Sequence, residues 1–339
     1  VDWLMVQSKD DEKVGIVFFG GEPFMNYPVM KQVVEYANAR AKEYNKTVDY
    51  SVTTNGSLLN DEKIAFLKDN KIYPTVSMDG NREIQDKQRP LPNGKGTYDL
   101  TAPKVRKLLK AIPTTSCRGT IFDDRDTGDA EKGLRDLGFA TTYLTVASPS
   151  LFDNKPDQKP TKKRFDNSCK KARREFDQIR MVLKDRDSET LRSLQETGTW
   201  AKKIIRFTQE FSNHEKRYFP CGAGRHYVGV SSSGDVYPCH RLVGGKDQKL
   251  GSIFGKKLDR EVFHKTAMGV QDKNNCAKCY AKYVCAGGCH HDNLGATGHV
   301  HGPDNEMCDL TRYVVGLAAV LCSQLTDEDK AFLIGGKII

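Results

Sequence analysis

Seven of the ten cysteines in this chain fall between residues 221 and 308, and their spacing indicates metal chemistry. The seven are Cys221, Cys239, Cys276, Cys279, Cys285, Cys289 and Cys308. Four of them run as C-x2-C-x5-C-x3-C, and seven thiols exceed what one tetrahedral zinc ion accepts. An iron–sulfur cluster takes four ligands around a body larger than an ion, so its ligands come from different turns. The pattern therefore predicts two iron–sulfur clusters.

Two other uses of these cysteines stay open. A disulfide framework fits poorly, because the first half of the chain is cysteine-poor and the N-terminus shows no charged-then-apolar export signal. One or two structural zinc ribbons are the stronger alternative, given the C-x2-C spacing. Gly287 and Gly288, just before Cys289, favour iron, because glycine lets backbone N–H groups approach cluster sulfides closely.

The order of these residues resembles a known domain. Twelve residues separate Cys221 from Gly234, and four more precede Cys239. With the downstream cysteines, this resembles the SPASM domain, the C-terminal extension of many radical S-adenosylmethionine (SAM) enzymes that modify peptides. The resemblance implies a first auxiliary [4Fe–4S] cluster on Cys221, Cys239 and Cys289. It implies a second on Cys276, Cys279, Cys285 and Cys308.

That assignment leaves the first cluster with only three cysteines. Some relatives, notably the anaerobic sulfatase maturases, carry an extra cysteine shortly after the first one, but residues 222–228 contain none. We therefore expect an open iron site that a substrate thiolate can occupy. Cys169, outside the motif, is the alternative fourth ligand.

Composition indicates a soluble protein with two domains. The chain has 339 residues, a mean hydropathy of −0.59 and no apolar run of membrane-spanning length, so no membrane partner is expected. Its net charge is +9, and residues 155–174 hold nine Lys or Arg against two Asp. This run lacks interleaved aromatic residues, so we interpret it as a solvated connector and not as a nucleic-acid surface. Reduced thiols in this number predict a cytoplasmic location.

Apolar runs alternate with helical patterns through the first 146 residues. Strands are predicted at 14–19, 48–54, 73–78, 115–122 and 139–146, and helices at 28–45, 60–67, 101–110 and 129–137. This alternation predicts an α/β fold with a parallel sheet or barrel.

The remaining chain is less regular. Beyond the basic connector we predict two polar helices, at 165–183 and 188–211, and interpret them as spacers. The predicted domains are a barrel at 1–150, a connector with helices at 151–217, a SPASM domain at 218–325 and a tail at 326–339.

Glycine and polar residues follow four of the predicted strands, at the edge where parallel β/α folds place their chemistry. The segments are Gly20-Gly21-Glu22-Pro23, Thr53-Thr54-Asn55-Gly56, Ser77-Met78-Asp79-Gly80 and Cys117-Arg118-Gly119. Each alone is weak, because a glycine pair after a strand is usually an ordinary turn. Together, ahead of the cysteine region, they resemble the radical SAM core. The resemblance implies a partial (β/α)6 radical SAM barrel.

The same resemblance implies a SAM-binding site. Gly20, Gly21, Glu22 and Pro23 would hold the methionyl amine, Ser77 and Arg118 would meet the carboxylate, and Asn55 would line the same pocket. Glu22 can accept from an ammonium group, and Arg118 can clamp a carboxylate in a bidentate way. The plainer alternative for Arg118 is a salt bridge on the barrel rim. Asp79 and Asp86, near Arg89, are interpreted as a loop ion-pair network.

The SAM-cleaving motif of this family is not found before the glycine-rich segment. Radical SAM enzymes carry C-x3-C-x2-C after the first barrel strand, but residues 1–19 contain no cysteine. The first cysteine, Cys117, is interpreted as a buried apolar residue on a strand. By the family's layout, residues 2–13 would end the first helix. We therefore expect this chain to be a fragment that lacks the first strand and cluster loop and cannot cleave SAM. A degenerate relative is the alternative.

The resemblance implies a peptide-modifying oxidoreductase. A third [4Fe–4S] cluster, on the missing part, would split SAM to a 5′-deoxyadenosyl radical that removes a hydrogen atom from a ribosomally made peptide or protein. A low-potential donor such as flavodoxin or ferredoxin would supply electrons. The open iron favours thioether formation from a substrate cysteine, as in maturases of quinohemoprotein amine dehydrogenase.

Three alternatives to thioether chemistry remain. An anaerobic sulfatase maturase would form formylglycine, although the relatives considered place Asp where this chain has His240. His240 is the only catalytic candidate, and a structural role for it is equally open. A non-catalytic degenerate barrel and a zinc-binding peptide-recruitment module are the others. A nearby histidine group indicates either a metal site or surface polarity; it consists of His290, His291, His299 and His301.

Overall fold

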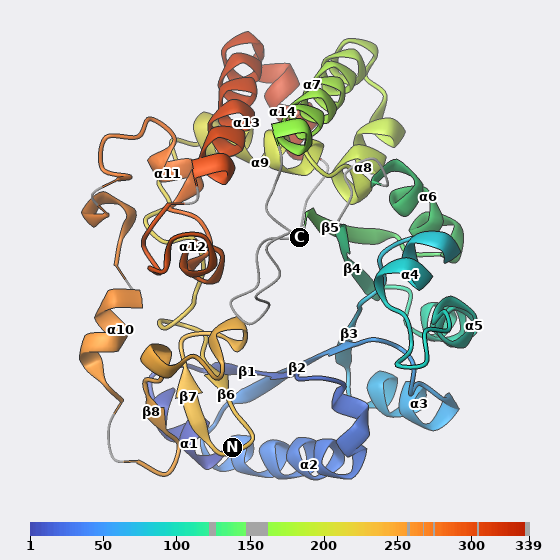
Figure 1. Cartoon of the computed structure of the whole chain (residues 1–339), viewed down its shortest axis with the longest axis vertical. Coiled ribbons are helices and arrows are strands. Elements are labelled where there is room, and N and C mark those ends of the chain that lie inside the picture. Colours follow the sequence, from blue (N-terminus) through green and yellow to red (C-terminus); the bar gives the residue numbers. More distant parts are fainter. Residues whose placement is uncertain are drawn as a thin grey trace. The chain divides into compact units, whose positions relative to one another are not determined.

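The computed structural model describes residues 1–121, 127–146, 162–255, 258–266, 268–273, 275–303 and 305–335. The chain forms two compact units, Val1–Val146 and Ala147–Ile339, coloured along the sequence in Figure 1. Residue 122 of the predicted fourth strand, residues 155–161 of the basic run and residues 336–339 of the predicted tail lie outside the described residues.

The first unit is built on a five-stranded parallel sheet in the order β1-β2-β3-β4-β5 (Figure 1). Its strands are β1 (Lys13–Phe18), β2 (Thr47–Thr54), β3 (Ile72–Val76), β4 (Ser116–Ile121) and β5 (Thr141–Val146). Each strand pairs in parallel with the next along the chain. The predicted α/β class with a parallel sheet is confirmed.

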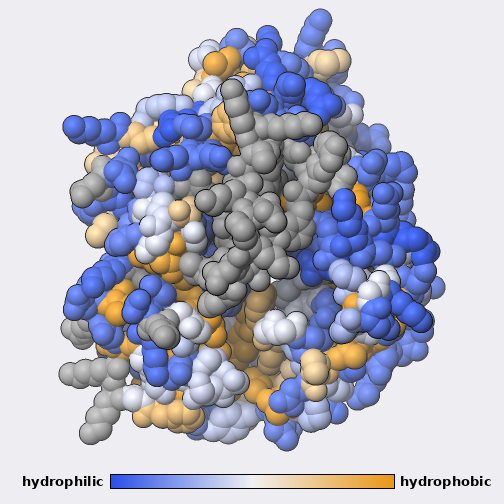
Figure 2. Space-filling view, viewed as in Figure 1, coloured by the Kyte–Doolittle hydropathy of each residue, from blue (hydrophilic) through white to orange (hydrophobic). Residues whose placement is uncertain are grey.

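The helices of this unit pack on one face of the sheet. They are α1 (Asp2–Gln7), the 3-10 turn η1 (Pro23–Asn26), α2 (Tyr27–Glu43), α3 (Asp61–Asp69), α4 (Arg82–Gln88), α5 (Tyr98–Ala111) and α6 (Thr127–Leu137). Buried side chains such as Val34, Leu67 and Leu108 from the helices meet Val52 and Val76 from the strands. The visible outer surface of these helices is mainly hydrophilic (Figure 2). The other sheet face carries exposed side chains, among them Val17, Tyr73 and Tyr143.

Local signals explain most of these elements. Asn60 begins α3 by accepting a hydrogen bond from the Lys63 N–H at 2.9 Å, as predicted. Asn81 begins α4 in the same way through the Ile84 N–H at 3.1 Å. Helix α4 was not predicted, because seven mostly polar residues give no apolar periodicity.

Five helices of the second unit share one apolar core. They are α7 (Lys162–Asp185), α8 (Ser188–Thr197), α9 (Ala201–Ser212), α13 (Asn305–Gln324) and α14 (Asp327–Gly335). Phe176, Trp200, Ile204 and Leu321 are buried in it. The interpretation of the 165–183 and 188–211 helices as spacers is therefore wrong. The second is two helices, divided at Gly198, whose backbone is extended.

The rest of the second unit is short elements and loops. A three-stranded antiparallel sheet consists of β6 (Gly229–Val230), β7 (Asp235–Tyr237) and β8 (Gly251–Ser252). The helical turns are η4 (His240–Leu242), η5 (Lys246–Gln248), α10 (Arg260–Thr266), η6 (Val270–Asp272), α11 (Lys282–Cys285) and α12 (His290–Thr297). Among the described residues, none of the helices has the length and apolar character needed to cross a membrane.

Replacing Ile204 by Ala tests the helical core. Ile204 is fully buried, so the variant should lose about 2–4 kcal/mol of unfolding free energy, measured by urea unfolding followed by circular dichroism. Met181→Ala on α7 is the control, because that side chain is 63% exposed and its loss should cost less than about 0.5 kcal/mol. Equal midpoints for the two variants would restore the spacer interpretation.

Candidate functional site

In the first unit, the predicted SAM-binding residues lie in one row across the sheet. Phe18 is level with Val52, Thr54 with Val76, and Val76 with Cys117. Continuing this register brings Gly21, Asn55, Ser77 and Arg118 to the same level of four neighbouring strands. These residues are separated in sequence by more than 20 positions and are brought together only by the parallel pairing.

Glu22 ties the ends of β1 and β2 together. Its carboxylate accepts hydrogen bonds from the Thr54 hydroxyl at 2.8 Å, the Asn55 N–H at 2.8 Å and the Phe24 N–H at 3.2 Å. A carboxylate has about four acceptor positions, so it can still meet an ammonium group. Its evident task in this structure is to fix the loop that follows β1.

The two glycines before Glu22 leave free space beside the backbone. Gly20 has φ +146°, a conformation that L side chains rarely adopt. A Cβ built on Gly20 or Gly21 would meet no atom within 4 Å, and both residues are exposed. This open backbone fits the close approach of a ligand such as SAM.

Arg118 lies within β4 and not at the strand end where the sequence placed it. Strand β4 continues to Ile121, beyond the level at which β3 ends, so Arg118 faces Tyr143 of β5. It is exposed, and no ion pair involves it among the described residues, so the expected rim salt bridge is not found. Its guanidinium is therefore available to an anionic ligand.

The loop after β3 is held by a buried ion pair, as predicted. The Asp79 carboxylate accepts from Arg89 Nε at 2.7 Å and Nη2 at 3.0 Å, and from the Thr120 N–H at 2.8 Å. Asp86 does not pair with Arg89 but accepts from the Tyr98 N–H at 2.7 Å. This network connects the segment that carries Ser77 to β4, which carries Arg118.

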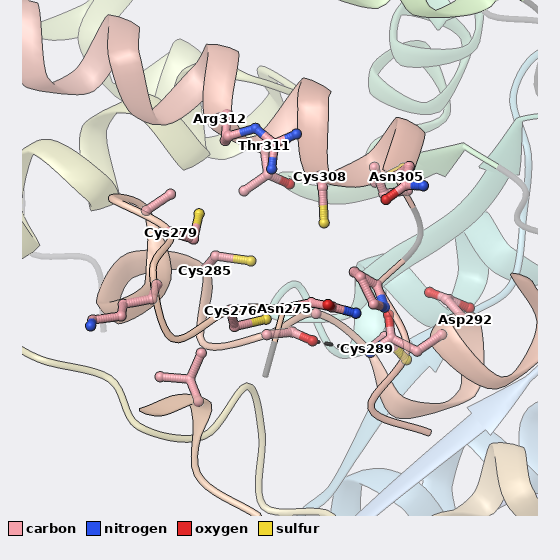
Figure 3. Close-up of a pocket in the computed structure, with 18 residues that line it drawn as sticks. Asn275, Cys276, Cys279, Cys285, Cys289, Asp292, Asn305, Cys308, Thr311 and Arg312 are labelled. Carbon is pink, nitrogen blue, oxygen red and sulfur yellow. Dashed lines mark hydrogen bonds between the residues drawn. The ribbon is translucent and has the colours of Figure 1, made fainter. Parts of the chain in front are cut away.

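In the second unit, five thiols line one pocket of about 560 Å³. Four of them, Cys276, Cys279, Cys285 and Cys308, are the set expected to bind the second cluster, and the fifth is Cys289, which was expected to belong to the first. The sulfur atoms of Cys276, Cys285 and Cys308 point into the same space, with Cys279 beside them (Figure 3). Cys308 comes from the first turn of α13, whereas the other three come from the 276–285 segment. Burial, and then the charge of the Cys285 thiolate, raise the pKa of Cys308 to about 11.

The remaining three thiols, Cys221, Cys239 and Cys289, are called here the three-thiol group. Burial raises the pKa of Cys239, and the negative charges of Cys289 and Cys221 raise it further. Cys239 precedes η4, and Cys289 precedes α12. Cys221 and Cys289 are exposed, so a ligand from outside can reach this group. Cys169 packs instead against the helical core from α7.

Polar side chains surround this three-thiol group. Arg241 Nη1 donates to Cys289 Sγ at 3.4 Å, and its Nη2 pairs with Asp292 at 2.8 Å. His240, the catalytic candidate, shares a 2.6 Å hydrogen bond between its Nδ1 and the Tyr227 hydroxyl. Burial raises the pKa of Tyr227, as do the nearby charges of Cys239 and Cys221.

Two observations fit a negatively charged cluster in the thiol region. Lys273 is 2% exposed, and its Nζ has no hydrogen-bond partner among the described residues. Ala286, Gly287 and Gly288 are successive residues with positive φ, a conformation that turns backbone N–H groups toward an anion. Such a loop and an unpaired ammonium both suit iron-bound sulfide and thiolate.

The histidines after Cys289 contact one another. The rings of His290 and His301 are 5.7 Å apart between centroids, and those of His299 and His301 are 5.8 Å apart. His291 contacts Asp292 through Nδ1 at 3.2 Å. Within the part of the chain that the structure describes, no three His, Cys, Asp or Glu side chains are grouped closely enough to hold a single metal ion.

Comparison with known proteins identifies the first unit. Residues 2–137 match the model of the Radical SAM superfamily. These residues form a radical SAM domain. The match includes the Gly20–Pro23 segment and the whole register row from Gly21 to Arg118.

Two curated relatives extend this result. An uncharacterized protein of Methanocaldococcus jannaschii is 35% identical over 101 residues, which are 30% of this chain and 34% of that protein. The serine-type anaerobic sulfatase-maturating enzyme of Klebsiella pneumoniae is 22% identical over 310 residues, 90% of this chain and 74% of that enzyme. The second alignment therefore continues from the radical SAM domain into the cysteine-rich unit.

A solved structure matches the fold of nearly the whole chain. This is anSMEcpe with bound AdoMet and Cp18Cys peptide, with a TM-score of 0.70 and 17% identity, covering 96% of this chain and 90% of that one. At this identity the likeness shows a shared fold, a radical SAM domain followed by a SPASM-like, cysteine-rich region.

Several residues near the candidate sites were not predicted from the sequence. Tyr227, Arg241 and Lys273 lie next to the thiols, but nothing in their spacing separates them from other surface residues. In the radical SAM domain, Thr54 was seen only as part of a turn, whereas its hydroxyl fixes Glu22. Only the position of Lys273 three residues before Cys276 offered a signal.

Cys117 provides a test of burial by pH. It is fully buried, as predicted, and burial raises its pKa to about 12 from 9.0. Above about pH 9 the unfolded chain releases this proton and the folded chain keeps it, so the folded state loses stability as pH rises. Cys117→Ala should therefore lose less stability than the wild type between pH 8 and pH 10, measured by urea midpoints. Equal losses would contradict this.

Proposed function

We propose that the protein is a radical SAM maturase that acts on a ribosomally made peptide or protein and forms a thioether from a substrate cysteine. The supporting observation is the group of three thiols that includes the exposed Cys221 and Cys289. One ligand position of a cluster bound there would remain for a substrate thiolate. The peptide bound to anSMEcpe, which shares the fold, supports a peptide substrate.

The residues of the radical SAM domain would bind and orient SAM. The open backbone at Gly20 and Gly21 would receive the methionyl amine beside Glu22 and Pro23. Arg118 and Ser77 would meet the carboxylate, and Asn55 would line the same pocket. When bound, SAM and a reduced [4Fe–4S] cluster would supply the hydrogen-abstracting chemistry, and oxidised auxiliary clusters would take up the surplus electron.

The residues around the three thiols would receive the peptide. Arg241 would hold the Cys289 sulfur, since its position is fixed by Asp292. The Tyr227–His240 pair would hold a proton at Nδ1 next to Cys239. In this role His240 would accept the proton that the substrate thiol releases.

Formylglycine formation is the second candidate function. The similarity to the Klebsiella pneumoniae maturase extends over 90% of this chain, which favours it. His240, directly after Cys239, would then serve as the base. A low-potential donor such as flavodoxin or ferredoxin, and a cytoplasmic location, belong to either proposal.

Metal analysis tests the two auxiliary clusters. Anaerobically purified protein with both thiol groups filled should contain about eight iron atoms and as much sulfide per chain from them. Cys276→Ala with Cys279→Ala, or Cys221→Ala with Cys239→Ala, should each remove about half of that iron. Cys322→Ala is the control, because this thiol contacts Ser212 on the helical side and should leave iron unchanged. Zinc without iron would instead mean a zinc-binding recruitment module.

Mass spectrometry of the product separates the two reactions. The protein, reduced and supplied with SAM under anaerobic conditions, is incubated with a cysteine-containing candidate peptide. Loss of two hydrogen atoms with a crosslink that survives reduction indicates a thioether, and an aldehyde that reacts with hydrazine indicates formylglycine. The unmodified peptide, together with intact clusters, would favour the non-catalytic alternative.

A further inference from the structure

Lys273 is a buried cation that the proposed reaction does not use. It lies at the end of η6 and is 2% exposed, one of the largest fully buried side chains. Its Nζ makes no hydrogen bond with any described residue. An unpaired polar group in the interior is destabilising, and an ammonium more so, unless an opposite charge is near. The burial of this ammonium without a partner indicates that the opposite charge belongs to a bound group.

The surroundings of Lys273 show where that charge would be. Burial lowers the pKa of Lys273, and the negative charges of Cys276 and Cys285 from the four-thiol group and of Cys221 from the three-thiol group oppose that shift. The Lys273 carbonyl oxygen accepts a hydrogen bond from the Cys276 N–H at 2.8 Å, so Lys273 lies beside the four-thiol group. The loop beside it is shaped to leave room, because a Cβ on Gly287 would lie 2.7 Å from Nζ.

The other cations near the thiols are more exposed. The Arg241 side chain is 35% exposed and paired with Asp292, and the Arg312 side chain is 39% exposed and paired with Asp309. Water screens such charges, so their effect on a nearby redox group is smaller. Lys273 is the fully buried cation of this region.

We propose that Lys273 is the internal counter-ion of the thiol-bound clusters, and that its ammonium raises their reduction potentials. This rests on the proposal that the seven thiols bind iron–sulfur clusters. Reduction adds negative charge, and a positive charge at a fixed buried position stabilises the reduced form more than the oxidised form. Lys273 is thus a positioning residue for electron uptake and touches no substrate.

The test compares Lys273→Met with Lys278→Met in the full chain. Both variants remove one positive charge near Cys276, but Lys278 is exposed. Clusters are titrated anaerobically with dithionite and followed by electron paramagnetic resonance. At equal solution potential, Lys273→Met should show at least about a tenfold lower ratio of reduced to oxidised cluster, about 59 mV for one electron. Lys278→Met should change the ratio less than about twofold.

Two further measurements distinguish the loss of the charge from a folding defect. Lys273→Arg retains the charge and should keep the wild-type potential and iron content. In the metal-free chain Lys273→Met should be no less stable than the wild type, because it removes an unsatisfied buried amine.

The outcomes separate this proposal from the one on which it rests. Wild-type protein without iron would overturn both. Iron-loaded Lys273→Met with unchanged potentials, or with a shift no larger than that of Lys278→Met, would overturn the counter-ion alone. Loss of iron from Lys273→Met and Lys273→Arg alike would also overturn it, because the charge would then not be the property that matters.

Discussion

Seven thiols gathered in one small region impose an electrostatic constraint on the second unit. As thiolates they repel one another, and burial raises the pKa of Cys239, Cys276 and Cys308. The chain opposes this with an ammonium at Lys273, a guanidinium at Arg241 and a loop of left-handed residues. The positive charges beside the thiols therefore suit a bound group that is negatively charged.

In the radical SAM domain, two carboxylates hold the loops that follow the strands. Glu22 joins the ends of β1 and β2, and Asp79 joins the loop after β3 to Arg89 and to β4. Both act on backbone N–H groups, so they fix loop conformations and not merely side chains. The row from Gly21 to Arg118 on four strands can stay in register only if the loops that carry it are held in this way.

Much of this could be predicted from the sequence, for physical reasons. Strands rich in apolar, β-branched and aromatic residues alternate with helical patterns, so all five were found, and the cap at Asn60 marked α3 correctly. The two thiol groups followed from a resemblance carried by the spacing of seven cysteines; the structure brings the four thiols of the second group to one pocket, which Cys289 of the first group also lines. Arg118 was grouped with the strand-end residues although the predicted strand at 115–122 already contained it, and the structure places it within β4.

What could not be predicted depends on tertiary contacts. Helices α7 and α9 are rich in Lys and Arg, so their narrow apolar stripes suggested solvated spacers, although Ile204 and Phe176 lie at the centre of a core. Lys273 is the buried one among the Lys and Arg residues that the structure describes, and only its position three residues before Cys276 offered a signal in the sequence. Tyr227 and His240 meet only because the chain turns back around β6 and β7.

The helical core continues into the wall of the four-thiol pocket. Ala281 and Val284 are buried in it, Cys279 packs against it, and Cys308 begins α13, whose later turns form its centre. Because the pocket wall is part of this core, the fold of the wall does not depend on a bound cofactor. A cluster bound there, if destroyed by oxygen, would leave a pocket whose wall the helical core still holds in place, so new iron and sulfide could enter without resynthesis of the protein.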